Sequence, residues 1–182
     1  MGGEAMPQRR QPTMEPLEEE VDHVRGPSAV GVLVKYGDYD CPCSRQAFRA
    51  IERVERQLNG GVRFAFRHFP LTDIHPHALA AAAAAEAAAL QYRFWGMHKL
   101  LLHRQRTLED DDLRRYAAEL DLDVQQFAQD RADAGVARRI RRDVESGLAS
   151  GEVRGTPTLF IDGDVHRGDY DAATLVEALT RG

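Results

Sequence analysis

The chain has 182 residues, of which 43% are apolar and 29% charged, and its net charge is -5. This composition is typical of one globular domain with a real core. The acidic balance argues against nonspecific nucleic-acid binding, which leaves a basic footprint. The apolar run Ala78–Ala85 is far shorter than the roughly 20 residues of a membrane span. We therefore expect neither nucleic acid nor membrane as a partner.

The first 28 residues are polar and charged, with no apolar stretch ahead of a cleavage site. They do not form a secretory signal. We interpret residues 1–28 as a disordered leader or an expression remnant, and residues 29–182 as one domain. The expected location is cytoplasmic, or periplasmic or extracytoplasmic if a signal has been removed.

The first part of this domain predicts a strand, a helix and a second strand. Residues 29–36 are apolar and β-branched, which indicates a buried strand. Residues 44–58 have apolar side chains at helical spacing, and Asn59-Gly60-Gly61 is a helix stop. Residues 62–69 alternate apolar and basic side chains, as a strand does. Such an order favours a right-handed parallel unit.

The middle of the chain, at about 76–150, predicts a helical insertion. Pro76 suits the first turn of a helix reaching about His103. Further helices are expected after Thr107, where Asp110–Asp112 favour a helix N-terminus, after the capping box at Asp123–Gln126, and through an arginine-rich stretch ending near Gly147 or Gly151.

The chain then returns to strands. Residues 158–161 predict a strand, Asp162-Gly163 a hairpin turn and residues 165–167 the return strand. Asp171 is expected to cap a last helix over 172–179. The predicted order is β-α-β, helical insertion, β-β-α.

Cys41 lies where the first strand ends and the first helix begins. Free backbone N–H groups at a helix N-terminus stabilise a thiolate, so Cys41 is expected to be nucleophilic. Pro42 suits the first helical position. Strand-end placement also puts Cys41 at the edge of the sheet where α/β folds bind ligands.

The partner of Cys41 is unresolved at this level. The chain has two cysteines. Cys43 lies only two positions after Cys41, and side chains two positions apart on a helix point about 200° away from each other. A Cys41–Cys43 disulfide would therefore need an irregular first turn. Cys43 is either a redox partner or a buried, inert packing residue. Ser44, three positions on, is expected to hydrogen-bond the thiolate.

Two other groups have competing interpretations. A metal bound by Cys41 and Cys43 would need more ligands, such as His75 or His77, and these histidines fit capping or packing better. We therefore expect no metal. Gly155-Thr156-Pro157 precedes the strand at 158–161, and its X-Pro bond is a candidate cis bond.

Taken together, these motifs resemble the thioredoxin superfamily, in its DsbA-like branch with a helical insertion. The resemblance covers roughly Val30 to the C-terminus. It is carried by Tyr36–Pro42, Arg67–Leu71, Ile74–Ala78, Ala84–Ala87, Phe94–His98 and Gly155–Gly163.

The resemblance implies an α/β thioredoxin-like fold of DsbA type and thiol–disulfide exchange. Cys41 matches the family's nucleophile and Pro157 its cis-proline. The loop of Gly155 and Thr156 would bind an extended substrate segment by strand addition. Ser44 stands at the family's resolving cysteine, which makes ordinary dithiol cycling doubtful.

We therefore expect a thiol–disulfide oxidoreductase, with monothiol chemistry as one form. Its catalytic residues would be Cys41, Pro42, Cys43 and Ser44. Partners would be client proteins or small thiols with disulfides, without a cofactor but with glutathione as a candidate co-substrate. We expect a monomer or homodimer. The alternatives are a peptide-binding module without redox turnover and a glutathione-dependent isomerase or transferase.

Overall fold

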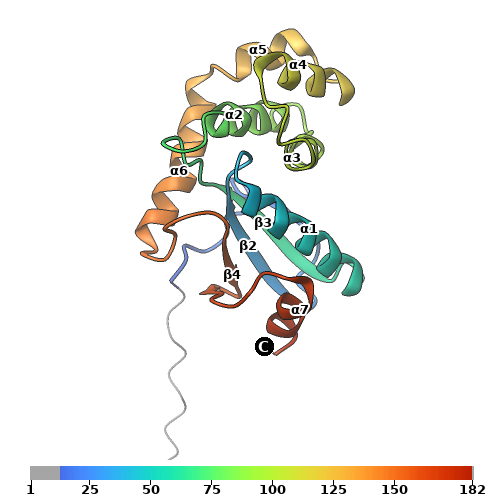
Figure 1. Cartoon of the computed structure of the whole chain (residues 1–182), viewed down its shortest axis with the longest axis vertical. Helices are drawn as coiled ribbons and strands as arrows, with labels where there is room; N and C mark the ends of the chain where they lie inside the picture. Colours follow the sequence, from blue (N-terminus) through green and yellow to red (C-terminus); the bar gives the residue numbers. More distant parts are fainter. Residues whose placement is uncertain (1–12, 182) are drawn as a thin grey trace, which may run out of the picture.

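The computed structural model describes residues 13–181 and shows a five-stranded sheet with helices on both faces and at one end (Figure 1). The strands are β1 (His23–Arg25), β2 (Gly31–Gly37), β3 (Val62–His68), β4 (Thr158–Ile161) and β5 (Asp164–Val165). The helices are α1 (Pro42–Gln57), α2 (Ala78–Ala89), α3 (Phe94–His103), α4 (Asp110–Glu119), α5 (Val124–Asp130), α6 (Ala134–Ala149) and α7 (Ala172–Thr180).

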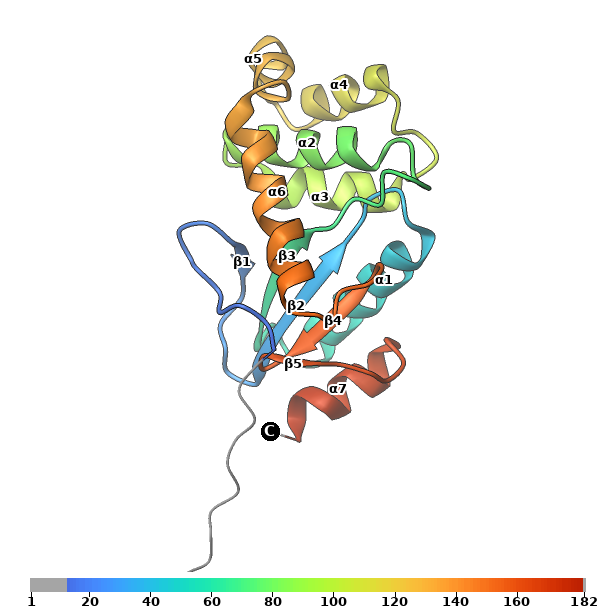
Figure 2. The same ribbon diagram turned by 90° about the vertical axis from the view of Figure 1, so that its left-hand side faces the viewer.

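The sheet has the strand order β1-β3-β2-β4-β5. Strands β2 and β3 are parallel, as the strand-helix-strand pattern predicted, and the other neighbours are antiparallel. Helices α1 and α7 pack on one face and α6 crosses the other (Figure 2). The helices α2–α5 lie beyond the ends of β2 and β3. The expected α/β thioredoxin-like fold of DsbA type is confirmed.

Helix α1 shows why the predicted elements form where they do. Pro42 occupies its first turn, where no N–H is needed. Its buried side, with Phe48, Ile51 and Val54, packs on the sheet. The helix ends where Asn59 and the next glycine adopt positive φ angles, 49° and 74°.

The helix expected from Pro76 to His103 is two helices. Helix α2 begins at Ala78 and ends at Ala89, and α3 begins at Phe94. Between them Tyr92 has a φ of 61°, a left-handed conformation that a continuous helix excludes. The break lets α3 fold back beside α2, whose small alanine side chains are mostly buried.

Interpreting residues 1–28 as a disordered leader is wrong for residues 13–28, while residues 1–12 lie outside the described part. Residues 23–25 form the edge strand β1, which pairs with β3. Asp22 accepts two hydrogen bonds from the buried guanidinium of Arg67, at 2.9 and 2.8 Å. Arg67 also donates to the carbonyls of Glu15 and Pro16, so this segment is tied to the sheet.

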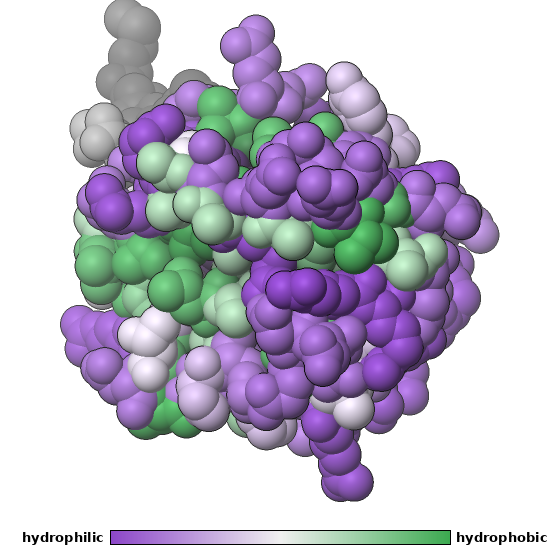
Figure 3. Space-filling view, turned by 90° about the horizontal axis from the view of Figure 1, so that it is seen from above, coloured by the Kyte–Doolittle hydropathy of each residue, from purple (hydrophilic) through white to green (hydrophobic). Residues whose placement is uncertain are grey.

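The end formed by the helical insertion is mostly hydrophilic, with a larger apolar patch at the left of the view and smaller ones near its centre (Figure 3). The large apolar side chains that are exposed in the described chain are Ile74, Leu79, Leu90, Tyr92 and Leu148. No helix within residues 13–181 combines the length and apolar character needed to cross a bilayer.

Candidate active site

Cys41 is the residue immediately before helix α1, in the turn that follows β2. Its backbone is extended, with φ -81° and ψ 119°, and Pro42 begins the helix behind it. Only 5% of the residue is exposed. Its thiol donates a hydrogen bond to the carbonyl oxygen of Thr156, at 3.3 Å. Two segments that are far apart in the sequence thus meet at this sulfur.

The second segment is the turn before β4. The Thr156–Pro157 bond is cis, as expected from the sequence. Strand β4 pairs with β2 so that Thr158 lies opposite Tyr36, which brings the preceding turn beside Cys41. The Thr158 hydroxyl donates to the carbonyl of Gly155 at 2.8 Å and fixes the turn. The hydroxyl of Thr156 has no hydrogen-bond partner among the described residues.

Ser44 lies in the first turn of α1 and is fully buried. Its hydroxyl accepts the backbone N–H of Asp38 at 3.2 Å, and its carbonyl accepts the Lys35 ammonium at 2.7 Å. Within the described residues no hydrogen bond joins Ser44 to the Cys41 thiol. In this structure Ser44 fastens the turn to the helix.

The thiols of Cys41 and Cys43 are both free. Cys43 is exposed, so interpreting it as a buried packing residue is wrong. Burial, followed by the nearby Cys43 thiol, raises the pKa of Tyr170. The two sulfurs thus differ in exposure: the thiol of Cys41 is buried against the Thr156 carbonyl, whereas Cys43 is exposed.

Asp38 holds the Cys41 turn against the loop that precedes α2. Its carboxylate accepts the backbone N–H groups of Asp40 and Leu71, at 2.8 and 2.9 Å, and lies 2.7 Å from Nδ1 of His75. The carboxylate of Asp40 accepts the backbone N–H of His77 at 3.1 Å. His75 and His77 thus belong to a structural contact between loops, as favoured from the sequence.

The helical insertion also holds the Cys41 turn. The side-chain amide of Gln105, just after α3, donates to the carbonyls of Tyr39 and Cys41, at 2.6 and 2.9 Å. The Tyr39 hydroxyl lies 2.9 Å from Nδ1 of His98 on α3. Burial raises the pKa of Tyr39 and lowers that of His98 well below its usual range, and the Lys35 charge lowers the latter further. Both side chains are therefore neutral at pH 7.

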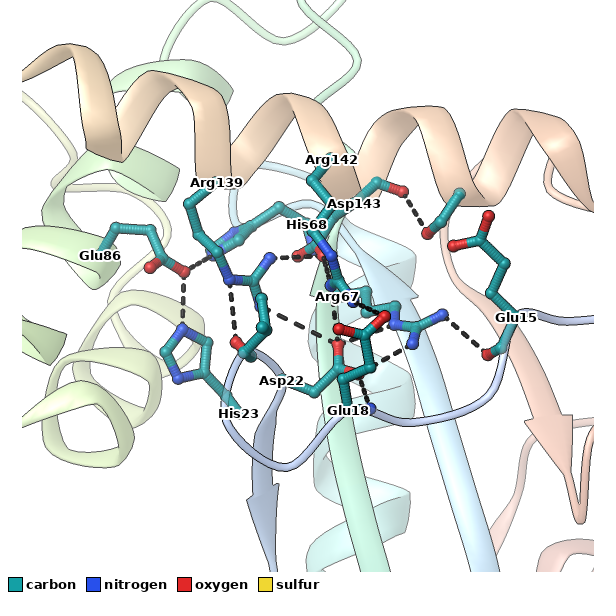
Figure 4. A network of polar contacts seen from close by, with 12 residues as sticks. Glu15, Glu18, Asp22, His23, Arg67, His68, Glu86, Arg139, Arg142 and Asp143 are labelled. Atoms are coloured by element: carbon teal, nitrogen blue, oxygen red, sulfur yellow. Dashed lines mark hydrogen bonds and ion pairs between the residues drawn. The ribbon is translucent and has the colours of Figure 1, made fainter.

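Two histidines and a glutamate, residue types that can bind a metal, lie close together where β1, β3 and α2 meet (Figure 4). Nε2 of His23 and Nε2 of His68 lie 2.7 and 2.6 Å from the same carboxylate oxygen of Glu86. Burial opposes ionisation of Glu86, but the hydrogen bonds from both histidines outweigh it and hold its pKa far below the usual range. Arg139 lines the hollow of about 270 Å³ beside this group. These distances and the nearby cation fit a hydrogen-bonded triad.

The network beside this triad joins α6 to the N-terminal segment (Figure 4). Arg142 contacts the Asp22 carboxylate at 3.3 Å, and Arg139 donates to the carbonyl of Val21 at 3.0 Å and pairs with Asp143. An arginine-rich helix face is usually solvated. Arg139 and Arg142 of α6 instead face the N-terminal segment, because Asp22 and Asp143 are buried there.

Sequence reasoning missed Asp38, Gln105 and Lys35. Lys35 could have been noticed, because it is a lone cation within an apolar β-branched run. Asp38 lies in the Tyr36–Pro42 motif, but its role depends on a loop more than 30 residues away in the sequence. Gln105 has no signal in the sequence, because its partners are backbone carbonyls.

Comparisons with known proteins agree on the fold. The sequence profile described as thioredoxin matches residues 18–181. A thioredoxin-like oxidoreductase from Silicibacter pomeroyi superposes with a TM-score of 0.77 at 25% identity, over 90% of this chain and 92% of that one. BdbD from Bacillus subtilis gives 0.75 at 20% identity, over 91% and 96%. The thiol-disulfide exchange protein α-DsbA2 from Wolbachia pipientis gives 0.77 at 19%, over 90% and 88%.

Curated relatives are more similar in sequence and much longer. The chain is 45% identical over 168 residues to Na(+)/H(+) antiporter NhaA 1 of Salinispora arenicola, covering 92% of this chain and 26% of that protein. It is 44% identical over 173 residues to NhaA 1 of Mycolicibacterium gilvum, covering 93% and 28%. The chain thus spans about a quarter of the length of these relatives.

The profile match spans nearly the whole described chain, and the sheet order, helical insertion and cis bond beside Cys41 agree with it. The chain belongs to the thioredoxin family and has the DsbA-like form of its fold.

Proposed function

We propose that this protein is a thiol–disulfide oxidoreductase in which Cys41 is the nucleophile. The observation that carries the proposal is the meeting of the Cys41 thiol with the turn before β4, at 3.3 Å from the Thr156 carbonyl. A thiol at a helix N-terminus is where a thiolate is stabilised. The fold is that of structures named for thiol–disulfide exchange.

The chemistry follows in two exchange steps. The Cys41 thiolate attacks one sulfur of a substrate disulfide, and the S–S bond breaks with its electron pair on the departing sulfur. A second thiol then attacks the mixed disulfide and releases Cys41. The substrate backbone would lie along the Gly155–Pro157 turn by strand addition.

We propose that the second thiol comes from outside the chain, with glutathione as the simplest candidate. Ser44 is buried and already bonded to the Asp38 N–H, and it carries no thiol. Cys43 is exposed, and its thiol is free. Since α1 is regular from Pro42, a Cys41–Cys43 bond would require the first turn to unwind.

The test is a trapping experiment with matched single variants. The Cys43→Ser protein, mixed with oxidised glutathione, should carry one glutathione on Cys41 by peptide mass mapping, and should reduce insulin when reduced glutathione is supplied. The Cys41→Ser protein should do neither. Full activity of Cys41→Ser would refute the proposal. Absence of any mixed disulfide on Cys41 would favour the binding module without redox turnover.

We also propose that this redox unit acts on a membrane antiporter. The supporting observation is its 45% identity to part of a protein named Na(+)/H(+) antiporter. The test is to add the oxidised or reduced chain to vesicles holding that Salinispora arenicola protein, and to measure Na⁺-driven proton flux. A change that depends on Cys41 would support the role. Equal flux with the wild-type and Cys41→Ser chains would contradict it.

A further inference from the structure

Lys35 is a buried cation directly beneath the first turn of α1. It is 0% exposed. Its ammonium donates to the carbonyl of Ser44 at 2.7 Å and lies 6.0 and 5.8 Å from the ring centres of Phe48 and Phe66. The same turn of α1 starts at Cys41. Lysine is rarely buried unless an anion accompanies it.

No carboxylate within residues 13–181 forms an ion pair with Lys35, unlike the arginines around it. The charged and titratable groups that act on it are Cys41 at the start of α1, Arg25 on β1 and His98 on α3. Arg25 already has its own partner, Glu55, at 2.7 Å, and His98 is neutral. Among the described groups that act on Lys35, Cys41 is the one that can supply the missing negative charge, as a thiolate.

Burial lowers the pKa of Lys35 to about 7, and the negative charge of Cys41 acts against this shift. Proton loss from Lys35 is therefore within reach at neutral pH, provided that the charge on Cys41 disappears. That charge disappears whenever the Cys41 sulfur enters a disulfide.

We propose that Lys35 is the proton partner of Cys41: it is an ammonium while Cys41 is a thiolate, and becomes a neutral amine when the Cys41 sulfur is bonded in a mixed disulfide. The proposal rests on the oxidoreductase function. In the attack, the thiolate electron pair forms the new S–S bond and the old S–S bond leaves its pair on the departing sulfur. Lys35 releases one proton, and the departing thiolate takes up one. When a second thiol frees the Cys41 thiolate, Lys35 takes a proton back.

This role differs from a merely structural one. As a tether, Lys35 would hold the Ser44 carbonyl in every state, and its loss would change stability alone. As a proton partner, it must shift the pH dependence of Cys41, and Cys41 must shift that of Lys35. Lys35 is then a positioning residue that acts through the thiolate.

The first experiment measures the rate of Cys41 carboxymethylation from pH 4 to 10 in a Cys43→Ser background, so that one thiol reports. Replacing Lys35 by Met keeps an unbranched side chain, one atom shorter, and removes its charge. The rate at pH 6, taken relative to the rate at pH 10, should fall at least tenfold in Lys35→Met. The same pH midpoint in a folded Lys35→Met protein would overturn the proposal.

The second experiment keeps Lys35 and stays decisive if Lys35→Met fails to fold. The chain has only two lysines, Lys35 and Lys99, and the side chain of Lys99 is 62% exposed. Labelling lysine with ¹³C thus gives two NMR signals, with Lys99 as internal reference. In Cys41→Ala the proton affinity of Lys35 should fall at least tenfold relative to the parent, with Lys99 unchanged. An unchanged Lys35 titration would overturn the proposal.

Neither measurement uses a substrate, so the oxidoreductase function and the role of Lys35 can be refuted independently of each other. Coupled titrations in a protein without insulin reductase activity would refute the oxidoreductase function. Uncoupled titrations in an active protein would refute the role of Lys35.

Discussion

The Cys41 thiol and the Thr156 carbonyl, 115 residues apart in the chain, are joined by a hydrogen bond of 3.3 Å. The thiol is the donor and the carbonyl oxygen can only accept. Ionisation of Cys41 removes the donor, so this bond belongs to the protonated thiol. The thiolate is freed from the carbonyl, and the carbonyl is freed to accept the backbone N–H of a substrate strand.

Thr156→Val should leave the Cys41 site intact, because the backbone of Thr156, not its hydroxyl, meets the thiol. Valine has the shape of threonine, and the hydroxyl it removes has no partner within the described chain. Its loss should therefore change the free energy of unfolding by less than about 1 kcal/mol. Carboxymethylation of Cys41 and KM for a peptide disulfide should both stay unchanged, because the backbone carbonyl is retained and the lost hydroxyl oxygen is buried. A slower carboxymethylation rate or a higher KM would contradict this prediction.

Gln105→Ala should loosen the Cys41 turn. The side-chain amide of Gln105 donates to the carbonyls of Tyr39 and Cys41, and losing both bonds should cost about 1–3 kcal/mol. Urea unfolding measures the cost, and hydrogen exchange should show faster amides in the turn. Gln91 is the matched control, because it bonds the backbone of Asp123 at an exposed site. Equal losses for Gln91→Ala and Gln105→Ala would contradict the prediction.

The parts of the fold that local patterns determine could be predicted. Apolar runs, the Asn59-Gly60 stop and the cap at Asp171 identified β2, α1 and α7 to within two residues. Strand β1 has three residues, and pairing with β3 forms it, so no local pattern indicates it. The break at Tyr92 was also missed, because apolar periodicity continues across it and the fold-back depends on packing of α2 against α3.

The same distinction holds for the candidate site. The position of Cys41 before α1 and the cis bond at Pro157 could be predicted, because each combines a residue type with a position beside a strand. The surroundings of Cys43 depend on Tyr170, which comes after β5 and meets it only in the folded chain.

Asp22→Asn should show that the N-terminal segment is part of the fold. The change leaves the fully buried guanidinium of Arg67 without its carboxylate, and breaking a buried ion pair costs about 3–5 kcal/mol. Glu19→Gln breaks an exposed contact with Arg63, which should cost less than about 1 kcal/mol. Urea unfolding compares the two. Equal, small losses would mean that this segment adds little to stability.

Acid should destabilise the protein in two stages. Burial lowers the pKa of both His23 and His98 from the ordinary value of 6.5. Below pH 6.5 the unfolded chain therefore binds protons that the folded chain does not, and stability falls as pH falls. Each such histidine contributes up to about 1.4 kcal/mol per pH unit.

The carboxylates of Glu86 and Asp22 form the second stage. Burial alone would raise the pKa of both carboxyl groups. Hydrogen bonds from the two histidines lower the pKa of Glu86 below its ordinary value of 4.5. Hydrogen bonds from Arg67 lower the pKa of Asp22 below its ordinary value of 3.8. Their contribution is present above those values and is lost as pH falls through the folded-state pKa. Denaturant unfolding from pH 8 to 3 measures both stages. His98→Asn should reduce only the slope near pH 6, by up to about 1.4 kcal/mol per pH unit, and leave the carboxylate stage intact. An unfolding free energy that stays constant between pH 8 and 5 would contradict the histidine stage, because two buried neutral histidines require that dependence.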